Sequence, residues 1–326
     1  MLRLPDHWAW DSWIADDGQR SHLFFLRASR ALVAPVLRHR RAAIGHATSV
    51  DMRTWQQGPD ALVHSDGPEW DDLAIWTGCT VRADDGRWWL FYTGFSHAEN
   101  GRVQRIGAAT SKDMVTWLRV RNGPLLEADP RWYEKLDLDV WPEEAWRDPF
   151  VLRDPAGDGW HLIITARANS GPVDGRGVIG HARSRDLLDW EIQPPLTKPA
   201  GFGHQEVPQT RLVDGRPLLM FSCAQAPVAS SVPSAHRERP GGIWTALGES
   251  LLGPWDLANA QVVDHPTAYA GQLVRDREGS WYLHGFADGP NFDGTVLDPM
   301  PVRLGSDGLK LVTATSRNLR ATSTPV

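Results

Sequence analysis

The 326-residue sequence is poor in several features, and each scarcity excludes a class of protein. No apolar stretch approaches the roughly 18 residues that a membrane span requires. The net charge is -6 and no long basic run is present, which argues against nucleic-acid binding; we interpret the short segment RHRR at 38–41 as a solvated loop. The first residues, MLRLPDHW, contain no apolar signal region, which predicts a cytoplasmic protein.

Cysteine, tyrosine and helical periodicity are also scarce. The two cysteines, Cys79 and Cys223, lie in apolar runs and are predicted to be buried free thiols. Histidine and cysteine show no metal-ligand spacing such as C-x-x-C or H-E-x-x-H, so we expect no metal and no other cofactor. The 17 Trp, against 4 Tyr and 9 Phe, can fill a core or form platforms for sugar rings, and the count alone does not decide between these uses.

The sequence does contain a repeat. Three stretches share the pattern I-G-x-A-x-S-x-D-x-x-x-W, starting at Ile44, Ile106 and Ile179, and a degenerate fourth starts at Ile243. The pattern predicts an alternating strand, a turn in which Ser and Asp bond backbone groups, and a Trp that begins the next strand. The spacing of the copies is too long for a helical repeat and suits a four-stranded sheet with its loops.

A second pattern alternates with the first. Five segments, each a short strand, an Asp-Gly or Glu-Gly turn and an apolar strand, begin at Asp11, Thr77, Asp148, Glu206 and Gly271. Asp-Gly supplies the positive φ of a tight turn, so each segment is predicted to be a β-hairpin. The two patterns together predict an all-β fold, a single-domain five-bladed β-propeller over residues 1–315, followed by a polar tail at 316–326.

A propeller brings distant residues together. The first strand of each blade lines the central tunnel, so equivalent positions of different blades converge on one pocket. Three of the five leading residues, Asp11, Asp148 and Glu206, are carboxylic acids. Any one of them alone is equally explained by a bond to a turn amide, but three at the same predicted blade position favour a site. Carboxylates held close in a poorly solvated pocket cannot all ionise easily, so one should stay protonated.

The three acids lie in motifs that carry a family resemblance. WDSW at 10–13, WRDPFV at 146–151 and EVPQT at 206–210 resemble the acidic motifs of the β-fructosidase clan of glycoside hydrolases, families 32 and 68. This clan includes invertases, levanases, inulinases and levansucrases. WDSW is closer to family 68, whereas GHATS at 45–49 is closer to family 32. Too few residues follow the propeller for the C-terminal β-sandwich that is usual in family 32.

The resemblance implies a role for each matched residue. Asp11 would be the nucleophile, Asp148 the transition-state stabiliser and Glu206 the acid/base. The implied substrate-binding residues are Arg147, Trp76 and Thr77, with Trp10, His204 and Gln205 as further candidates. Core packing explains Trp10 and Trp13 equally well.

These roles imply a retaining mechanism. Ionised Asp11 would form a covalent fructosyl-enzyme and protonated Glu206 would protonate the leaving oxygen, cleaving β-fructofuranosyl bonds of sucrose or fructo-oligosaccharides with water or a sugar as acceptor. We expect the two carboxyls to lie about 5 to 5.5 Å apart, as in retaining enzymes. A wall of Trp side chains should raise the pKa of Glu206, and Ser12 is the candidate hydrogen-bond donor to Asp11.

Two alternatives stay open at this point. One is an inverting five-bladed glycosidase that cleaves arabinose or xylose polymers, which also uses two Asp and one Glu. The other is a non-catalytic propeller that binds carbohydrate. In every case the expected partner is a small carbohydrate, not nucleic acid or a membrane. The sequence leaves open the natural substrate, the acceptor, the oligomeric state and the role of the loop-like segment at 228–242.

Overall fold

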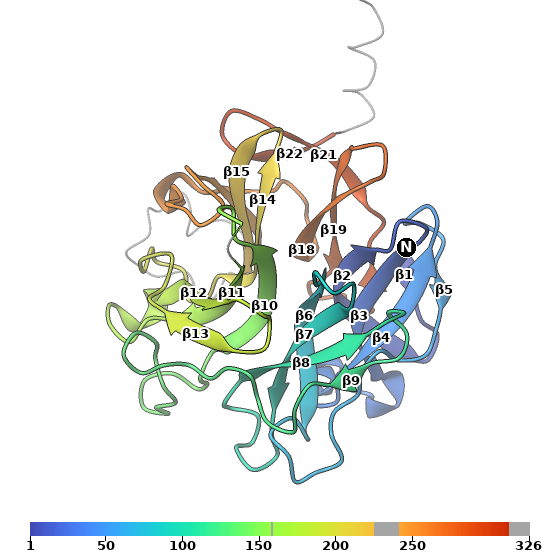
Figure 1. The fold of residues 1–326 in the computed structure, drawn as a ribbon, viewed down its shortest axis with the longest axis horizontal. Helices are drawn as coiled ribbons and strands as arrows, with labels where there is room; N and C mark the ends of the chain where they lie inside the picture. Colours follow the sequence, from blue (N-terminus) through green and yellow to red (C-terminus); the bar gives the residue numbers. More distant parts are fainter. Residues whose placement is uncertain (158, 225–240, 313–326) are drawn as a thin grey trace, which may run out of the picture.

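The strands surround a central axis as five antiparallel sheets (Figure 1) in a computed structural model that describes residues 1–157, 159–224 and 241–312. The first blade contains β2 (His7–Asp16), β3 (Ser21–Ser29), β4 (Ala43–Ser49) and β5 (Gln56–Gln57). The second contains β6 (Ala74–Arg82), β7 (Trp88–Phe95), β8 (Arg105–Ser111) and β9 (Leu118–Arg119). The third contains β10 (Trp146–Arg153), β11 (Trp160–Arg167), β12 (Gly177–Ser184) and β13 (Trp190–Gln193).

The last two blades complete the ring. The fourth contains β14 (Glu206–Val213), β15 (Arg216–Cys223), β16 (Gly242–Leu247) and β17 (Gln261–Val262). The fifth contains β18 (Ala268–Arg275), β19 (Trp281–Ala287), β20 (Thr295–Val296), β21 (Met300–Leu304) and β22 (Leu309–Leu311), joined by β1 (Leu2–Arg3) from the N-terminus. The innermost strands β2, β6, β10, β14 and β18 each contact the next around the axis, and β18 contacts β2. The prediction of an all-β, five-bladed propeller is confirmed.

The N-terminal segment closes the ring. Strand β1 pairs with β20, with Leu2 opposite Val296 and Arg3 opposite Thr295. The side chains of Leu2 and Leu4 are buried against the first and fifth blades. The alternation of apolar and polar residues in MLRLPDHW therefore reflects packing of an edge strand, and says nothing about where the protein resides.

The repeated S-x-D pattern forms the turn that was predicted. In the first blade the Ser49 hydroxyl donates to Asp51 at 2.7 Å, and the same carboxylate accepts the backbone N–H groups of Arg53 and Thr54, each at 2.8 Å. Asp113 and Asp186 accept equivalent bonds in the second and third blades. The pattern thus ends the third strand of three blades at the end of the ring where the hairpin turns also lie.

Packing explains most of the aromatic excess. Ten of the 17 Trp side chains are buried, and Trp10, Trp146 and Trp244 are among the largest fully buried side chains. Cys79 and Cys223 are buried free thiols, as predicted. No helix of the described residues is long and apolar enough to cross a membrane. The predicted tail at 316–326 and nearly all of the loop at 228–242 lie outside the described residues.

Candidate active site

Each innermost strand carries a β-bulge at an equivalent place. The pairing with the second strand of the blade shifts after Trp10, Trp76, Arg147, Glu206 and Tyr269. The residues that follow are Asp11, Thr77, Asp148, Val207 and Ala270, and all of them except Thr77 have positive φ, between 22° and 56°. Such backbone is costly for non-glycine residues, and bulges of this kind concentrate beside active sites, where they redirect side chains.

The bulges form the floor of one cavity. The five residues that precede the register shifts, Trp10, Trp76, Arg147, Glu206 and Tyr269, all line a cavity of about 450 Å³. Asp11 and Asp148 line the same cavity from the first and third blades. The three predicted acids span nearly 200 residues of the chain, and they meet in this cavity.

The strand register shows that the predicted blade position of Glu206 was wrong. Glu206 was expected at the same blade position as Asp11 and Asp148, but it is equivalent to Arg147, one residue earlier. The residue of the fourth blade that matches Asp148 is Val207, and that of the fifth blade is Ala270 instead of Gly271. Glu206 therefore lines the cavity from the position before the bulge, whereas the two aspartates line it from the position after the bulge.

Asp11 is a buried carboxyl with one strong donor. The Thr77 hydroxyl donates to Asp11 Oδ2 at 2.5 Å. Burial raises the pKa of Asp11 to about 7, the Thr77 bond opposes this shift, and the charges of Asp148 and Glu206 add to it. Ser12, which we expected to be the donor, instead pairs its hydroxyl with Nδ1 of His284 at 3.2 Å. That prediction was wrong because the bulge turns Ser12 away from the carboxyl of Asp11.

Asp148 is held more firmly. Its Oδ2 accepts the Thr165 hydroxyl at 2.8 Å and the Val207 N–H at 3.2 Å, and lies 3.5 Å from Arg147 Nε. Burial raises its pKa to about 6, with Arg147 opposing the shift. A carboxylate fixed by a hydroxyl, an N–H group and a guanidinium is suited to holding a ligand in place.

Of the three acids, Glu206 has the most cationic and hydrogen-bond-donating neighbours. Arg147 Nη2 donates to its Oε1 at 2.7 Å, the Tyr269 hydroxyl donates to its Oε2, and His204 Nδ1 lies 3.9 Å from Oε1. Burial raises the pKa of Glu206, but Arg147, then His204 and Tyr269, lower it more, so the net shift is downward. The predicted upward shift was wrong because the neighbours of Glu206 are a cation and donors, not an apolar Trp wall.

Arg147 connects this acid to a fourth carboxylate. Its Nη1 donates to Glu143 at 2.9 Å and to the Gln104 side chain at 3.0 Å. Glu143 also lies 3.3 Å from Nε2 of His204, and its pKa is lowered well below the usual range because Arg147 and His204 outweigh burial. Glu143 sits in the irregular segment before β10, so no strand pattern in the sequence identified it.

The remaining predicted residues fall into two groups. Trp10, Trp76 and His204 line the cavity, and the Trp76 Nε1 donates to the His39 carbonyl at 2.8 Å. Thr77 lies behind Asp11, and Gln205 is fully buried, with its amide donating to the Gly177 carbonyl at 3.1 Å. The Gln205 side chain is thus bonded to the backbone of the third blade and lies outside the cavity lining.

Sequence reasoning missed Tyr269, Arg38, His39 and Asp288, all of which line the cavity. Tyr269 carried a usable signal, because Trp76, Arg147 and Tyr269 each stand ten residues before the glycine of their hairpin turn. Arg38 and His39 lie in the 3-10 helix η2 (Pro35–Arg40) between β3 and β4. The interpretation of RHRR as a purely solvated loop was therefore wrong for its first two residues.

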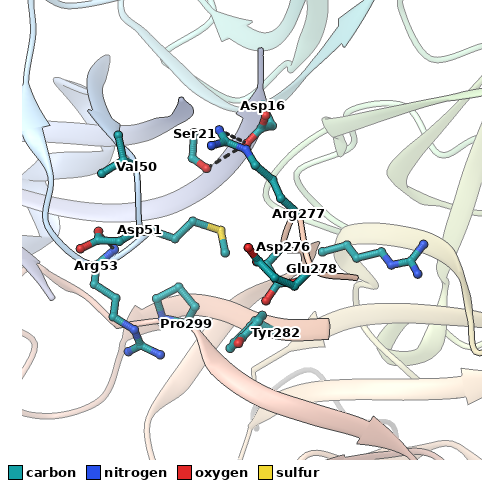
Figure 2. Close-up of a pocket in the computed structure, with 12 residues that line it drawn as sticks. Asp16, Ser21, Val50, Asp51, Arg53, Asp276, Arg277, Glu278, Tyr282 and Pro299 are labelled. Atoms are coloured by element: carbon teal, nitrogen blue, oxygen red, sulfur yellow. Dashed lines mark hydrogen bonds and ion pairs between the residues drawn. The ribbon is translucent and has the colours of Figure 1, made fainter. Parts of the chain in front are cut away.

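A second cavity, of about 270 Å³, lies at the opposite end of the ring, between the first and fifth blades (Figure 2). Its polar groups already bond one another: Asp16 accepts from Ser21 and Arg277, and Asp51 caps its turn. None of the predicted acids lines it. Among the described residues, no three His, Cys, Asp or Glu side chains are grouped as ligands for a metal ion.

Comparison with known proteins identifies the family. The sequence model described as the Glycosyl hydrolases family 32 N-terminal domain matches residues 22–298. The chain belongs to glycosyl hydrolase family 32. The matched region contains Asp148 and Glu206 and starts after Asp11. Among the described residues no β-sandwich follows the propeller.

Relatives of this family 32 protein include proteins named sucrase and levansucrase. An extracellular sucrase of Zymomonas mobilis is 25% identical over 303 residues, covering 79% of this chain and 70% of the relative. Levansucrase LscA of Pseudomonas savastanoi is 27% identical over 266 residues, covering 71% of this chain and 60% of the relative. An inulosucrase from Halalkalicoccus jeotgali, solved with kestose bound, has a TM-score of 0.79 and 23% identity, covering 95% of this chain and 88% of that one.

These findings establish the protein as a β-fructofuranosidase-like glycoside hydrolase. They set aside both the arabinan- or xylan-cleaving alternative and the non-catalytic one. They also contradict the predicted cytoplasmic location, because two relatives that match 79% of the chain are named extracellular sucrase. The prediction rested on the composition of the first residues, which β1 explains by packing.

Proposed function

We propose that this protein cleaves the β-fructofuranosyl bond of sucrose with retention, through a covalent fructosyl–Asp11 intermediate. The observation that carries the proposal is the convergence of Asp11, Asp148 and Glu206 on one cavity. Sucrose is the substrate we favour, because a sucrase and a levansucrase are among the relatives and an inulosucrase is a structural neighbour. The names of the sucrases favour action outside the cell.

The first step forms the ester. The ionised carboxylate of Asp11 attacks the anomeric carbon, the bond from that carbon to the glycosidic oxygen breaks, and the proton of Glu206 goes to the leaving oxygen. In the second step Glu206 takes a proton from water, the water oxygen attacks the anomeric carbon, and the ester breaks to regenerate Asp11. A sugar hydroxyl in place of water gives transfructosylation by the same chemistry.

Arg147 and Asp148 hold the fructosyl unit. A guanidinium offers a planar fork of donors and a carboxylate offers acceptors, so together they match neighbouring hydroxyls of a furanose ring. Asp148 is fixed by Thr165 and Val207 and does not react. Tyr269 holds Glu206 through its hydroxyl, which orients the acid toward the leaving oxygen.

Substrate binding must redistribute one proton. Burial raises the pKa of Asp11 to about 7 and Arg147 lowers the pKa of Glu206, so the protein groups alone favour the proton on Asp11, whereas the reaction needs it on Glu206. Fructosyl hydroxyls that occupy Arg147 weaken its pair with Glu206 and raise the pKa of that acid. Hydroxyls that donate to Asp11 stabilise its anion. Binding thus moves the proton to the group that must donate it.

The first experiment is an assay of sucrose, kestose and arabinan with the purified protein. We expect release of glucose and fructose from sucrose and no release of arabinose from arabinan. Absence of fructose release from both fructosides, by a folded protein, would contradict the proposal.

A further inference from the structure

Two arginines line the cavity, and they differ in how their donors are used. Arg147 is satisfied by Glu143, Gln104 and Glu206. Arg38 has one hydrogen bond within the described residues, from Nη1 to the Pro35 carbonyl of its own turn at 3.1 Å. Its Nε is buried and lacks a partner among the described residues. Arg38 lines the cavity, and its Nη2 forms no hydrogen bond within the described residues, so a bound ligand can satisfy that donor.

The Arg38 guanidinium is nevertheless held in place. It stacks at 4.0 Å from the ring centre of Phe292 and lies 5.5 Å from that of Trp10. These rings come from the segment after β19 and from the innermost strand of the first blade. A guanidinium that stacks on an aromatic ring is stabilised by a cation–π interaction. Because the side chain is already fixed, it loses little conformational entropy when it binds a ligand. The donors of Arg38 are thus pre-positioned.

An acceptor accompanies this donor. Asp288 lines the same cavity, and the charges of Asp288 and Asp11 both act on Arg38. Within the described residues Asp288 forms a bond through its backbone N–H, to the Thr267 carbonyl, and its carboxylate forms none. A guanidinium with an unused Nη2 and a carboxylate without a partner among the described residues, both in the lining of one cavity, match hydroxyls of a neutral sugar. An anionic substituent would meet the repulsion of Asp288, Asp11 and the other cavity acids.

The position of this pair indicates which sugar it contacts. The fructosyl unit must lie on the floor, where Asp11 attacks it and Asp148 and Arg147 hold it. Arg38 and Asp288 come from connecting segments, not from the innermost strands, and Arg38 stacks on a ring of the floor residue Trp10. The bond that breaks points away from Asp11, so the second sugar unit extends from the floor toward the connecting segments that line the cavity, and Arg38 and Asp288 lie in two of these segments.

We propose that Arg38, with Asp288, is a specificity-determining residue that binds hydroxyls of the sugar unit attached to the fructosyl group, the glucosyl unit in sucrose. This inference rests on the proposed function. It assigns recognition of the second sugar unit to two lining residues other than the three acids. It also places Arg38 where an acceptor sugar sits during transfer.

The test compares two donors in three proteins. The donors are sucrose and an activated fructosyl donor that lacks a second sugar, and the proteins are wild type, R38A and R40A. Arg40 is the matched control, because it lies on the same 3-10 helix and bonds Asn100 outside the cavity. We expect R38A to lower kcat/KM for sucrose about tenfold to a hundredfold more than for the activated donor, mainly through KM. R40A should match wild type on both.

Two further measurements complete the design. R38A should also lower the ratio of transfer to hydrolysis at high sucrose, because the acceptor loses the same contacts, and R38K should retain part of the discrimination. Equal losses on both donors, or none, with R38A folded as judged by thermal unfolding, would overturn the proposal. A wild-type preference for sucrose 6-phosphate that R38A abolishes would overturn the neutral-sugar assignment. Failure of wild type on both donors would instead refute the proposed function.

Discussion

The two ends of the propeller carry aspartates of opposite electrostatic character. At the cavity end, Asp11 and Asp148 are buried and their pKa values are raised to about 7 and 6. At the hairpin end, the turn residues Asp51, Asp113 and Asp186 have lowered pKa values, because backbone N–H groups of the turn donate to them. The same residue type, placed by two different patterns of the same blade repeat, is destabilised as an anion at one end and stabilised at the other.

Burial at the cavity end and backbone N–H groups at the hairpin end cause this difference. A tight turn directs successive N–H groups at one carboxylate, whereas a β-bulge in a buried strand exposes the side chain to a cavity and supplies few donors. A carboxylate with few donors, as Asp11 is, can react with a ligand, whereas Asp148, which has three partners, can hold one in place. The comparison therefore predicts that aspartates of the cavity end control turnover and those of the hairpin end control stability.

The largest effect is expected from a substitution of Asp11 at the cavity end. D11N should lower kcat/KM for sucrose by at least about 10⁴-fold, because an amide cannot form the ester. D113N at the hairpin end is the matched control and should stay within about twofold of wild type. Steady-state kinetics of both variants, with unfolding curves to verify the fold, make the measurement. Substantial turnover by D11N would refute its role as nucleophile.

The pH dependence of turnover sharpens the comparison. The pair Asp11 and Glu206 needs one proton in total, so kcat/KM should fall about tenfold per unit above pH 7, where the shared proton is lost. It should also fall in acid, below the usual range of glutamate, because the pKa of Glu206 is lowered. In E206Q, an activated donor should show no fall above pH 7. Persistence of that fall in E206Q would show that another group carries the proton.

D11N, which should lower activity, should raise the free energy of unfolding. Because the pKa of Asp11 is raised from 3.8 to about 7 in the fold, its charged form destabilises the protein increasingly between these values, and not below them. D11N removes this penalty, so it should be more stable than wild type by up to a few kcal/mol at pH 8 and equal to it at pH 3. Denaturant unfolding at both pH values tests this; a pH-independent difference would contradict it.

The smallest effect is expected at the hairpin end. D113N retains an acceptor oxygen but loses the charge that the N–H groups of Val115 and Thr116 stabilise. It should lower the free energy of unfolding by about 0.5 to 1 kcal/mol at pH 7, as loss of a helix cap does. S111A, which removes the partner hydroxyl, should have an effect of similar size. Loss of activity in either variant would contradict the division between the two ends.

The sequence predicts the fold and much of the cavity, for a definite reason. Hairpin turns and the S-x-D pattern are local features, so the repeats indicate five blades and bring Asp11, Asp148 and Glu206 to one end. The bulge register depends on strand pairing, so Glu206 was placed one residue out of step. The pKa shift of Glu206 and the role of Ser12 were predicted wrongly. They depend on Arg147, Tyr269 and Thr77, which approach from other blades. Glu143 lies in an irregular segment that no local pattern describes.

The anomeric form of the first product tests the central claim most directly. Sucrose is mixed with the enzyme in an NMR tube, with and without methanol, and spectra are recorded before the released fructose mutarotates. If Asp11 forms the intermediate and Glu206 lies about 5 to 5.5 Å from it, the first product has the β configuration and methyl β-fructofuranoside appears when methanol is present. An inverted first product, with no transfer to methanol, would contradict the account.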